Sequence, residues 1–415
     1  MSSNVVIRSL PFATSLVKRH AKDILARDRA RAQKLLAGLS PHGPRATRQA
    51  NSIEASDVES VDVTNAAVTY TMTVGVGSPA TDYTLLIDTG SSNTWIGADK
   101  SYEPTETATR TGNYFFVAYG SGVALGRQYL DQVTLGSNLV IEDQSIGVSI
   151  MARGFSGVDG ILGIGPVGLT AGMLPMHADV YQRTDKVYGT GTVTDTDAVP
   201  TVTDNLYSQG TIPTESIGIF YQPSTSSEEL AGGELSFGGP DSELYSSAIT
   251  YVPITSTSPA SNYWGIDQTL MYGDSTTLLS STAGIVDTGT TLLMIASDAF
   301  EAYKEATGAT LDETTGLLTV TEEQYATMES MYFTIGDTTF EFTANAQIWP
   351  RALNSTLGGD DDTIYLITAD LGSDSGQGLD FINGFAFLQR FYSVFDTTNS
   401  RVGIACTEYT QATTN

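Results

Sequence analysis

The chain has 415 residues, which is enough to bury a large core and to form two or three structural units. It contains a single cysteine, Cys406, and this excludes an intrachain disulfide, a cysteine-based zinc ribbon and a paired redox motif. The formal net charge of -27 at pH 7 argues against binding to nucleic acid.

The charge is distributed unevenly along the chain. Residues 1–50 contain ten Lys and Arg but only two acids, for a net charge of +8, whereas the remaining residues carry -35. An acidic body suits acidic surroundings, because protonation of its carboxylates relieves their mutual repulsion. Halophilic or merely soluble proteins have the same composition, so the charge alone leaves these alternatives open.

The basic N-terminal region has the pattern of an amphipathic helix from residue 15 to residue 39. Such a helix can bind a membrane surface or a nucleic acid. This one is joined to a body of opposite charge, which favours a detachable prosegment. The polar stretch that follows, with Pro41 and Pro44, is typical of an exposed linker where cleavage can occur. Arg8 and Pro11 interrupt the apolar residues near the start, so no clear signal peptide is present.

From Val63 onward the sequence consists of short apolar and Thr-rich runs divided by Gly, Ser and Pro, which predicts an all-β body. The clearest predicted strands are 69–76, 83–87, 113–119, 126–135, 219–222, 234–237, 332–335 and 392–395. Short helices are predicted at 298–307, 322–331 and 387–391. No run of 18 apolar residues occurs, so the sequence predicts no membrane span, and its polar tail predicts no lipid anchor.

A loose internal repeat divides the body into two halves. In each half an apolar, β-type run leads to an Asp-Thr-Gly triplet, and a later strand ends in a glycine. The triplets begin at Asp88 and Asp287. A duplicated lobe explains this pattern, so we expect a prosegment and linker at 1–62, an N-terminal lobe at 63–213 and a C-terminal lobe at 214–415.

The two triplet aspartates are the candidate catalytic residues. Asp88 and Asp287 each follow a run that predicts a buried strand, and a buried carboxylate needs a partner. Each could simply cap its own turn. If the lobes instead bring them together, they share a proton, because two adjacent carboxylates cannot both ionise. Such a pair can take a proton from water and give one to a carbonyl oxygen, without a covalent intermediate, and it titrates as a unit.

The residues around each aspartate are predicted to support it. The supporting set is Thr89, Gly90, Ser91, Thr288, Gly289 and Thr290. The two threonines of the triplets are expected to bond across the lobes, the glycines to allow close backbone approach, and Ser91 and Thr290 to hydrogen-bond the outer carboxylate oxygens.

These motifs resemble the pepsin-like aspartic proteases over residues 63–406, and within that family the secreted enzymes of basidiomycetes. The resemblance implies a bilobal pepsin-like fold of two related β-barrel lobes with a cleft between them. It also implies an aspartic endopeptidase that acts at acid pH and prefers apolar residues around the scissile bond. Asn383 departs from the family pattern, which has an apolar residue there, and the disulfides common in the family are absent.

The resemblance also implies a substrate-binding flap. Tyr119 resembles the aromatic residue near the tip of the flap hairpin, followed by Gly120 and Ser121 in the turn, and Trp95 is expected to pack against Tyr119 with its indole N–H free to donate. Without the family context Tyr119 could be an ordinary strand aromatic. Phe155 could form a wall of the substrate pocket or belong to the core.

Partners and location follow from the same reasoning. We expect a monomer that binds protein and peptide substrates and its own prosegment as an intramolecular inhibitor, with no nucleic acid, membrane, cofactor or metal. Lys22 or Lys34 is within reach of the aspartates in this arrangement. Secretion is expected from the family, with the vacuole as an alternative.

Two other functions remain open at this stage. A catalytically dead pepsin-like binding protein would keep the fold and hold a ligand, although such proteins usually lack an aspartate or the flap tyrosine, which are present here. A β-rich glycoside hydrolase also uses two carboxylates, but its chemistry does not require two matching Asp-Thr-Gly loops.

Overall fold

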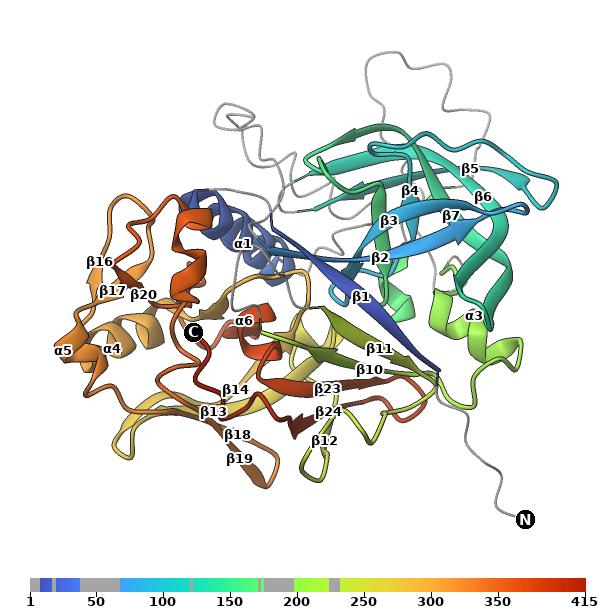
Figure 1. The fold of residues 1–415 in the computed structure, drawn as a ribbon. Helices are drawn as coiled ribbons and strands as arrows, with labels where there is room; N and C mark the ends of the chain where they lie inside the picture. Colours follow the sequence, from blue (N-terminus) through green and yellow to red (C-terminus); the bar gives the residue numbers. More distant parts are fainter. Residues whose placement is uncertain are drawn as a thin grey trace. The chain divides into compact units, whose positions relative to one another are not determined.

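The computed structural model describes residues 8–16, 20–37, 68–119, 122–170, 173–174, 198–223 and 232–415. These residues are mostly in strands, with a few short helices, which confirms the predicted all-β class (Figure 1). They form two compact units. The N-terminal unit consists of described residues between Thr71 and Thr211, and the C-terminal unit contains residues 212–415 with residues 8–36 and 68–70.

The N-terminal unit is built on long antiparallel strands. Its elements are β2 (Val68–Val76), β3 (Thr81–Asp88), β4 (Trp95–Ile96), β5 (Thr109–Ala118), β6 (Val123–Gly136), β7 (Leu139–Arg153), β8 (Gly160–Gly163), η1 (Val167–Thr170), β9 (Met173–Leu174) and α3 (Val202–Ser208). Buried and half-exposed residues alternate along β6, because successive side chains of a strand point to opposite faces of its sheet. β6 pairs with β5 on one side and with β7 on the other.

The C-terminal unit contains more and shorter elements. They are β1 (Arg8–Leu16), α1 (Ala21–Leu36), β10 (Ser216–Tyr221), β11 (Gly233–Phe237), β12 (Thr250–Pro253), η4 (Ala260–Asn262), β13 (Gly265–Tyr272), β14 (Thr276–Val286), β15 (Leu293–Ile295), α4 (Ser297–Thr307), β16 (Thr310–Leu311), β17 (Leu318–Val320), α5 (Glu322–Tyr325), β18 (Met331–Ile335), β19 (Thr338–Phe342), η5 (Arg351–Leu357), β20 (Ile364–Tyr365), β21 (Thr368–Asp370), β22 (Phe381–Asn383), α6 (Phe385–Leu388), β23 (Phe391–Asp396) and β24 (Arg401–Cys406).

The N-terminal region differs from the predicted helix over residues 15–39. The helix α1 begins at Ala21 and ends at Leu36, and residues 15 and 16 belong to the strand β1. β1 pairs antiparallel with β11, with Phe12 opposite Gly233. The Phe12 ring occupies the space that a Cβ on Gly233 would need, so this pairing depends on glycine. A helical periodicity alone could not show this tertiary pairing.

Two of the predicted short helices are also shorter than expected. The prediction of a helix at 322–331 was wrong after residue 325, because residues 331–335 form β18. The predicted helix at 387–391 is α6 at 385–388, and residue 391 begins β23. In both places strand pairing overrides the local pattern. The helix predicted at 298–307 matches α4.

The two units repeat the same arrangement of four strands around their triplets. In the N-terminal unit β3 runs parallel to β8, β8 is antiparallel to β4, and β4 is parallel to β7. In the C-terminal unit β14, β22, β15 and β21 pair in the same sequence of parallel, antiparallel and parallel. The internal repeat seen in the sequence therefore corresponds to a repeat in topology.

A buried amide pair explains the unexpected Asn383. Asn383 Nδ2 donates to Gln268 Oε1 at 2.9 Å, and Gln268 Nε2 donates to Asn383 Oδ1 at 3.3 Å. The two side chains are 0% and 2% exposed, so each satisfies the polar atoms of the other in a place that water does not reach. The polar residue at this position is therefore compatible with a well-packed core.

Replacement of Asn383 by leucine is expected to lower the free energy of unfolding by about 2–3 kcal/mol, because the Gln268 amide loses its partner inside the core. The double replacement Gln268→Leu with Asn383→Leu should recover most of that loss, since no orphaned polar group remains. Denaturant unfolding of the three variants measures both effects. A double variant no more stable than the single variant would contradict this account.

The Asn-Ser-Thr sequon at residue 354 lies inside the fold. Asn354 is fully buried, and its Nδ2 donates to the backbone carbonyls of Asp360, Asp361 and Thr363. The nitrogen that would carry a glycan thus holds the loop that leads into β20.

Candidate active site

The first aspartate lies at the end of β3 in the N-terminal unit. Asp88 is fully buried, and its Oδ1 accepts the Gly90 N–H at 3.0 Å while its Oδ2 accepts the Ser91 hydroxyl at 2.5 Å. The Asp88 carbonyl accepts the N–H of Ile164, which follows the parallel strand β8. The loop is thereby held both by its own donors and by the strand beside it.

The second aspartate follows β14 in the C-terminal unit and has the same local contacts. Asp287 is fully buried, and it accepts the Gly289 N–H on Oδ1 at 3.0 Å and the Thr290 hydroxyl on Oδ2 at 2.7 Å. Its backbone N–H donates to the carbonyl of Asn383 on β22 at 3.2 Å.

These two loops place the predicted supporting residues as follows. Gly90 and Gly289 each donate a backbone N–H to the aspartate two residues earlier, and Ser91 and Thr290 each donate a hydroxyl to the aspartate three residues earlier. Thr89 is 0% exposed and Thr288 is 7% exposed. A carboxylate that accepts two such bonds is held in one orientation, with the geometry that acid–base chemistry requires.

Three of the predicted substrate-binding residues, Trp95, Tyr119 and Phe155, lie in one aromatic cluster in the N-terminal unit. Trp95 Nε1 donates to the Tyr119 hydroxyl at 2.8 Å, and both residues are buried. The ring of Phe155 lies edge-on to both, with centroids 4.8 Å from Trp95 and 5.3 Å from Tyr119. Of the alternatives for Phe155, the structure places it in the buried cluster that supports Tyr119.

Tyr119 lies at the end of the hairpin made by β5 and β6. Its N–H donates to the carbonyl of Gly122 at 2.7 Å, which closes the turn. The predicted turn residues Gly120 and Ser121 lie outside the described residues. Gly122 was not predicted from the sequence; a Cβ there would clash with the carbonyl oxygen of Arg153 and with the Phe155 ring.

Loss of the Trp95–Tyr119 hydrogen bond is expected to reduce catalytic efficiency. Tyr119→Phe keeps the ring but leaves the buried indole N–H without its acceptor, which costs about 1–3 kcal/mol, so we expect kcat/KM for a peptide to fall about 10-fold. The double variant Trp95→Phe with Tyr119→Phe should lose much less than the sum of the single losses. Additive losses in this double-mutant cycle would show that the hydrogen bond does not couple the two residues.

A basic helix covers the second aspartate. Arg31 on α1 donates from Nε to Asp287 Oδ2 at 2.7 Å and from Nη2 to Asp287 Oδ1 at 2.9 Å, with both side chains buried. Lys22 and Lys34 were predicted from the sequence to lie within reach of the aspartates. The sequence did not identify which basic residue approaches the aspartates, and in the structure Arg31 makes the ion pair to Asp287. Its planar guanidinium matches both carboxylate oxygens at once, which a lysine cannot do.

Three neighbours of Arg31 add contacts between α1 and the C-terminal unit. Arg27 donates to the carbonyl of Gly289 at 3.0 Å, and Arg29 forms an ion pair of 2.8 Å with Asp370. Asp28 accepts the backbone N–H groups of residues 291 and 292, which follow the second triplet. The helix is therefore bound to Asp287, to the residues that follow it and to Asp370 at the end of β21.

Tyr263 is a further group near Asp287 that the sequence analysis missed. It follows η4 and is buried, and burial raises the pKa of its phenol above the usual value. The Arg31 cation lowers that pKa and the Asp287 anion raises it further. The phenol therefore stays protonated, and it interacts electrostatically with both charges of the ion pair.

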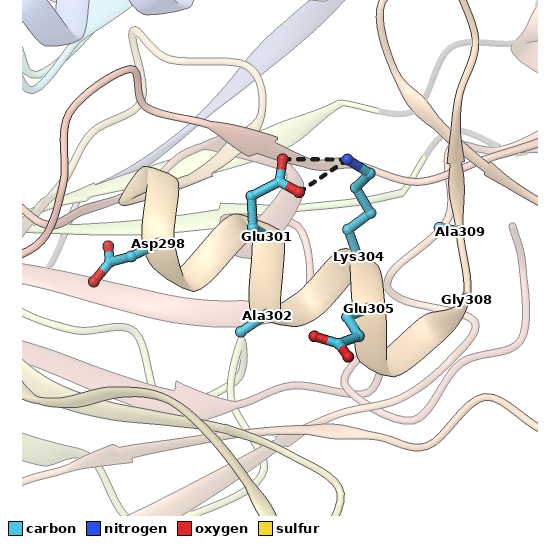
Figure 2. A pocket seen from close by; sticks show the side chains of 7 residues that line it. All are labelled: Asp298, Glu301, Ala302, Lys304, Glu305, Gly308 and Ala309. Carbon is cyan, nitrogen blue, oxygen red and sulfur yellow. Dashed lines mark hydrogen bonds and ion pairs between the residues drawn. The ribbon is translucent and has the colours of Figure 1, made fainter.

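A separate surface pocket lies on α4 and contains none of the predicted site residues (Figure 2). It is lined by Asp298, Glu301, Ala302, Lys304, Glu305, Gly308 and Ala309. Figure 2 shows Lys304 turned toward Glu301, with which it forms an exposed ion pair of 2.9 Å. Within the described part of the chain, no cluster of His, Cys, Asp and Glu has the geometry of a metal site. No helix among the described residues is both long and apolar enough to cross a bilayer.

The comparisons with known proteins agree with this geometry. The family model described as eukaryotic aspartyl protease matches residues 69–407, so the chain belongs to that family. It is an aspartic endopeptidase with a pepsin-like fold, as the sequence motifs predicted.

Individual proteins of this family show how similar the chain is to known enzymes. The chain is 59% identical to polyporopepsin of Irpex lacteus over 86% of this chain and 99% of the relative. Cathepsin E of Mus musculus is 28% identical over 81% of this chain and 79% of its own length. A crystal structure of aspartic proteinase from Irpex lacteus matches with a TM-score of 0.76 and 59% identity, covering 84% of this chain and 96% of the other.

Proposed function

We propose that the enzyme hydrolyses peptide bonds with one water molecule activated jointly by Asp88 and Asp287. The observation that carries this proposal is the match between the two triplet loops, which hold their carboxylates with the same donors at the same point of a repeated topology. One carboxylate removes a proton from the water while the other protonates the substrate carbonyl oxygen. Because the pair shares a proton, neither aspartate has a separate role.

The substrate is proposed to be an extended peptide with apolar side chains around the scissile bond. The aromatic cluster of Trp95, Tyr119 and Phe155 at the end of the hairpin made by β5 and β6 supports this preference, because its surroundings are apolar. The acidic composition of the body supports an acid optimum.

The chain is further proposed to be a zymogen, with residues 1–62 as prosegment and linker and with catalytic lobes at 63–213 and 214–415. The Arg31–Asp287 ion pair supports this proposal, because a carboxylate that is paired with a guanidinium cannot accept a proton from water. Acid would release the helix by protonating carboxylates on the enzyme, since the arginine keeps its charge. Secretion as a monomer is proposed with it, with a vacuolar location as the alternative.

Incubation of the purified precursor from pH 3 to pH 7 with a denatured protein substrate tests this function. The expected result is loss of the N-terminal segment and onset of proteolysis at acid pH, with little change at pH 7. A precursor that stays intact and inactive after prolonged incubation at acid pH would refute the zymogen proposal. A precursor fully active at pH 7 without cleavage would refute it as well.

A further inference from the structure

Asp370, at the end of β21, binds one arginine of α1 through two different acceptors. Arg29 donates from Nη2 to Asp370 Oδ2 at 2.8 Å and from Nε to the Asp370 backbone carbonyl at 2.9 Å. Gln33, about one turn further along α1, adds longer bonds from Nε2 to the carbonyls of Leu371 and Gly372, at 3.4 and 3.2 Å. The segment from residue 370 to residue 372 therefore presents a row of oxygen acceptors to the side chains of α1.

The acceptors of Asp370 are held in place by the body of the C-terminal unit. The other carboxylate oxygen, Oδ1, accepts the Ser297 hydroxyl at 2.6 Å and the Gly372 N–H at 2.8 Å. β21 is fixed on β15, because Ile295 pairs with Asp370 and the Ile295 carbonyl accepts the Leu371 N–H at 2.8 Å. None of these contacts involves α1, so the position of the acceptors does not depend on the helix.

The arrangement of these acceptors suits a guanidinium group. A planar guanidinium donates in two fixed directions at once, here to a carboxylate oxygen and to a carbonyl, whereas an ammonium acts as a point charge. The side chain of Asp370 is 23% exposed with α1 in place, so its free oxygen lies at the surface of the unit. Gly372 has a φ of +89°, and a Cβ there would lie 3.3 Å from Gln33 Nε2, so glycine leaves room for a side chain beside Asp370.

Asp370 also lies near the second triplet aspartate. Arg29 and Arg31 are two residues apart on α1, which places them about 3 Å apart along the helix axis, and Arg31 binds Asp287. An extended peptide advances about 3.3 Å per residue. The side chain of a substrate residue within about four positions of the scissile bond can therefore reach Asp370.

We propose that, once α1 has left, Asp370 and the carbonyls beside it form a subsite that binds an arginine side chain of the peptide substrate. This role depends on the proposed function, in which α1 is removed and a peptide is hydrolysed at Asp88 and Asp287. Arg29 of the precursor then occupies the place that a substrate guanidinium takes in the processed enzyme. The subsite adds a preference for arginine at one position to the apolar preference around the scissile bond.

Substitution along a peptide substrate of the processed enzyme tests this subsite. A fluorogenic peptide with apolar residues at the scissile bond carries arginine in turn at the second, third and fourth positions on each side. Each arginine peptide is compared with its citrulline counterpart, which has a similar shape but no charge. Arginine should raise kcat/KM over citrulline by about three- to fivefold at one of these positions, as for a partly exposed ion pair, and by less at the others.

A matched pair of variants separates Asp370 from general charge effects. Asp370→Asn should abolish the difference between arginine and citrulline, whereas Asp374→Asn removes the same charge from an exposed position nearby and should retain it. Equal kcat/KM for arginine and citrulline at every position would overturn the proposal, and this comparison needs only the unmodified enzyme. An undiminished preference in Asp370→Asn, or its loss in both variants, would overturn it as well. If the processed enzyme cleaves none of the peptides, the proposed function fails too, which distinguishes the two failures.

Discussion

Replacement of Asp287 by asparagine in the processed enzyme is expected to lower kcat for a peptide substrate by at least about 10³-fold. Asparagine keeps the shape, and its Oδ1 can still accept the Gly289 N–H while its Nδ2 donates to the Thr290 hydroxyl, but it cannot take up a proton from water. Asp88→Asn should have an equally large effect, because both carboxylates are needed for one proton relay. Single-turnover and steady-state assays at acid pH measure both losses.

Two buried aspartates outside the triplets provide matched controls. Asp131 in the N-terminal unit accepts the hydroxyls of Tyr102 and Thr107, and Asp380 in the C-terminal unit accepts the N–H groups of residues 376 and 377. Like the triplet aspartates, Asp131 and Asp380 are buried and accept two hydrogen bonds. Their asparagine variants should therefore lower the stability of the fold while kcat per folded molecule changes little. Equal losses of kcat in the control and triplet variants would mean that folding, and not chemistry, is affected.

The second large effect is expected from Arg31→Gln in the precursor. Breaking a buried ion pair costs about 3–5 kcal/mol, because the remaining charge loses its partner without access to water. The docking of α1 should therefore weaken by at least about 100-fold. The precursor is then expected to cleave a fluorogenic peptide at pH 6 from the first seconds, before any chain is processed.

Arg29→Gln is the control for this experiment. Arg29 also pairs with an aspartate, Asp370, but their side chains are 40% and 23% exposed, and exposed ion pairs contribute about 0–1 kcal/mol. Its initial rate should differ from that of the unmodified precursor by less than about fivefold. If Arg31→Gln gives the same initial rate as Arg29→Gln, the ion pair to Asp287 does not hold the precursor inactive.

The two triplet loops were predictable because their signal is local. An apolar β-type run followed by Asp-Thr-Gly and a hydroxyl residue describes a buried strand that ends in a tight turn, and the structure has this geometry at Asp88 and at Asp287. The repetition of the pattern predicted a duplicated lobe, and the four-strand topology around the triplets is repeated in the two units. Local sequence was sufficient here because the donors to each carboxylate lie within three residues of it.

The contacts of α1 were less accessible, although a signal existed. Ile24, Asp28, Arg31 and Leu35 follow one another at intervals of three or four residues and form the buried stripe of the helix. Two charged residues on an otherwise apolar stripe indicate specific partners, and this pattern could have selected Arg31 over the exposed Lys22. The partners of Asp28 and Arg31 lie more than 250 residues away in sequence, so only the tertiary structure identifies them.

The roles of Tyr263 and Gln268 could not be predicted from the sequence. Neither belongs to a recognisable motif, and each acquires its role from a neighbour on another element. Tyr263 interacts electrostatically with the Arg31–Asp287 pair, and Gln268 exchanges hydrogen bonds with the Asn383 amide across the sheet. Such roles depend on long-range packing, which residue spacing along one strand does not encode.

Titration of the processed enzyme with a tight-binding statine-type inhibitor tests the central claim, that the two aspartates form one catalytic unit. One inhibitor molecule per chain is expected to abolish proteolysis, and Asp88→Asn and Asp287→Asn are each expected to weaken inhibitor binding by at least about 100-fold. Proteolysis that persists at saturating inhibitor, or a variant that binds it as tightly as the unmodified enzyme, would contradict the claim.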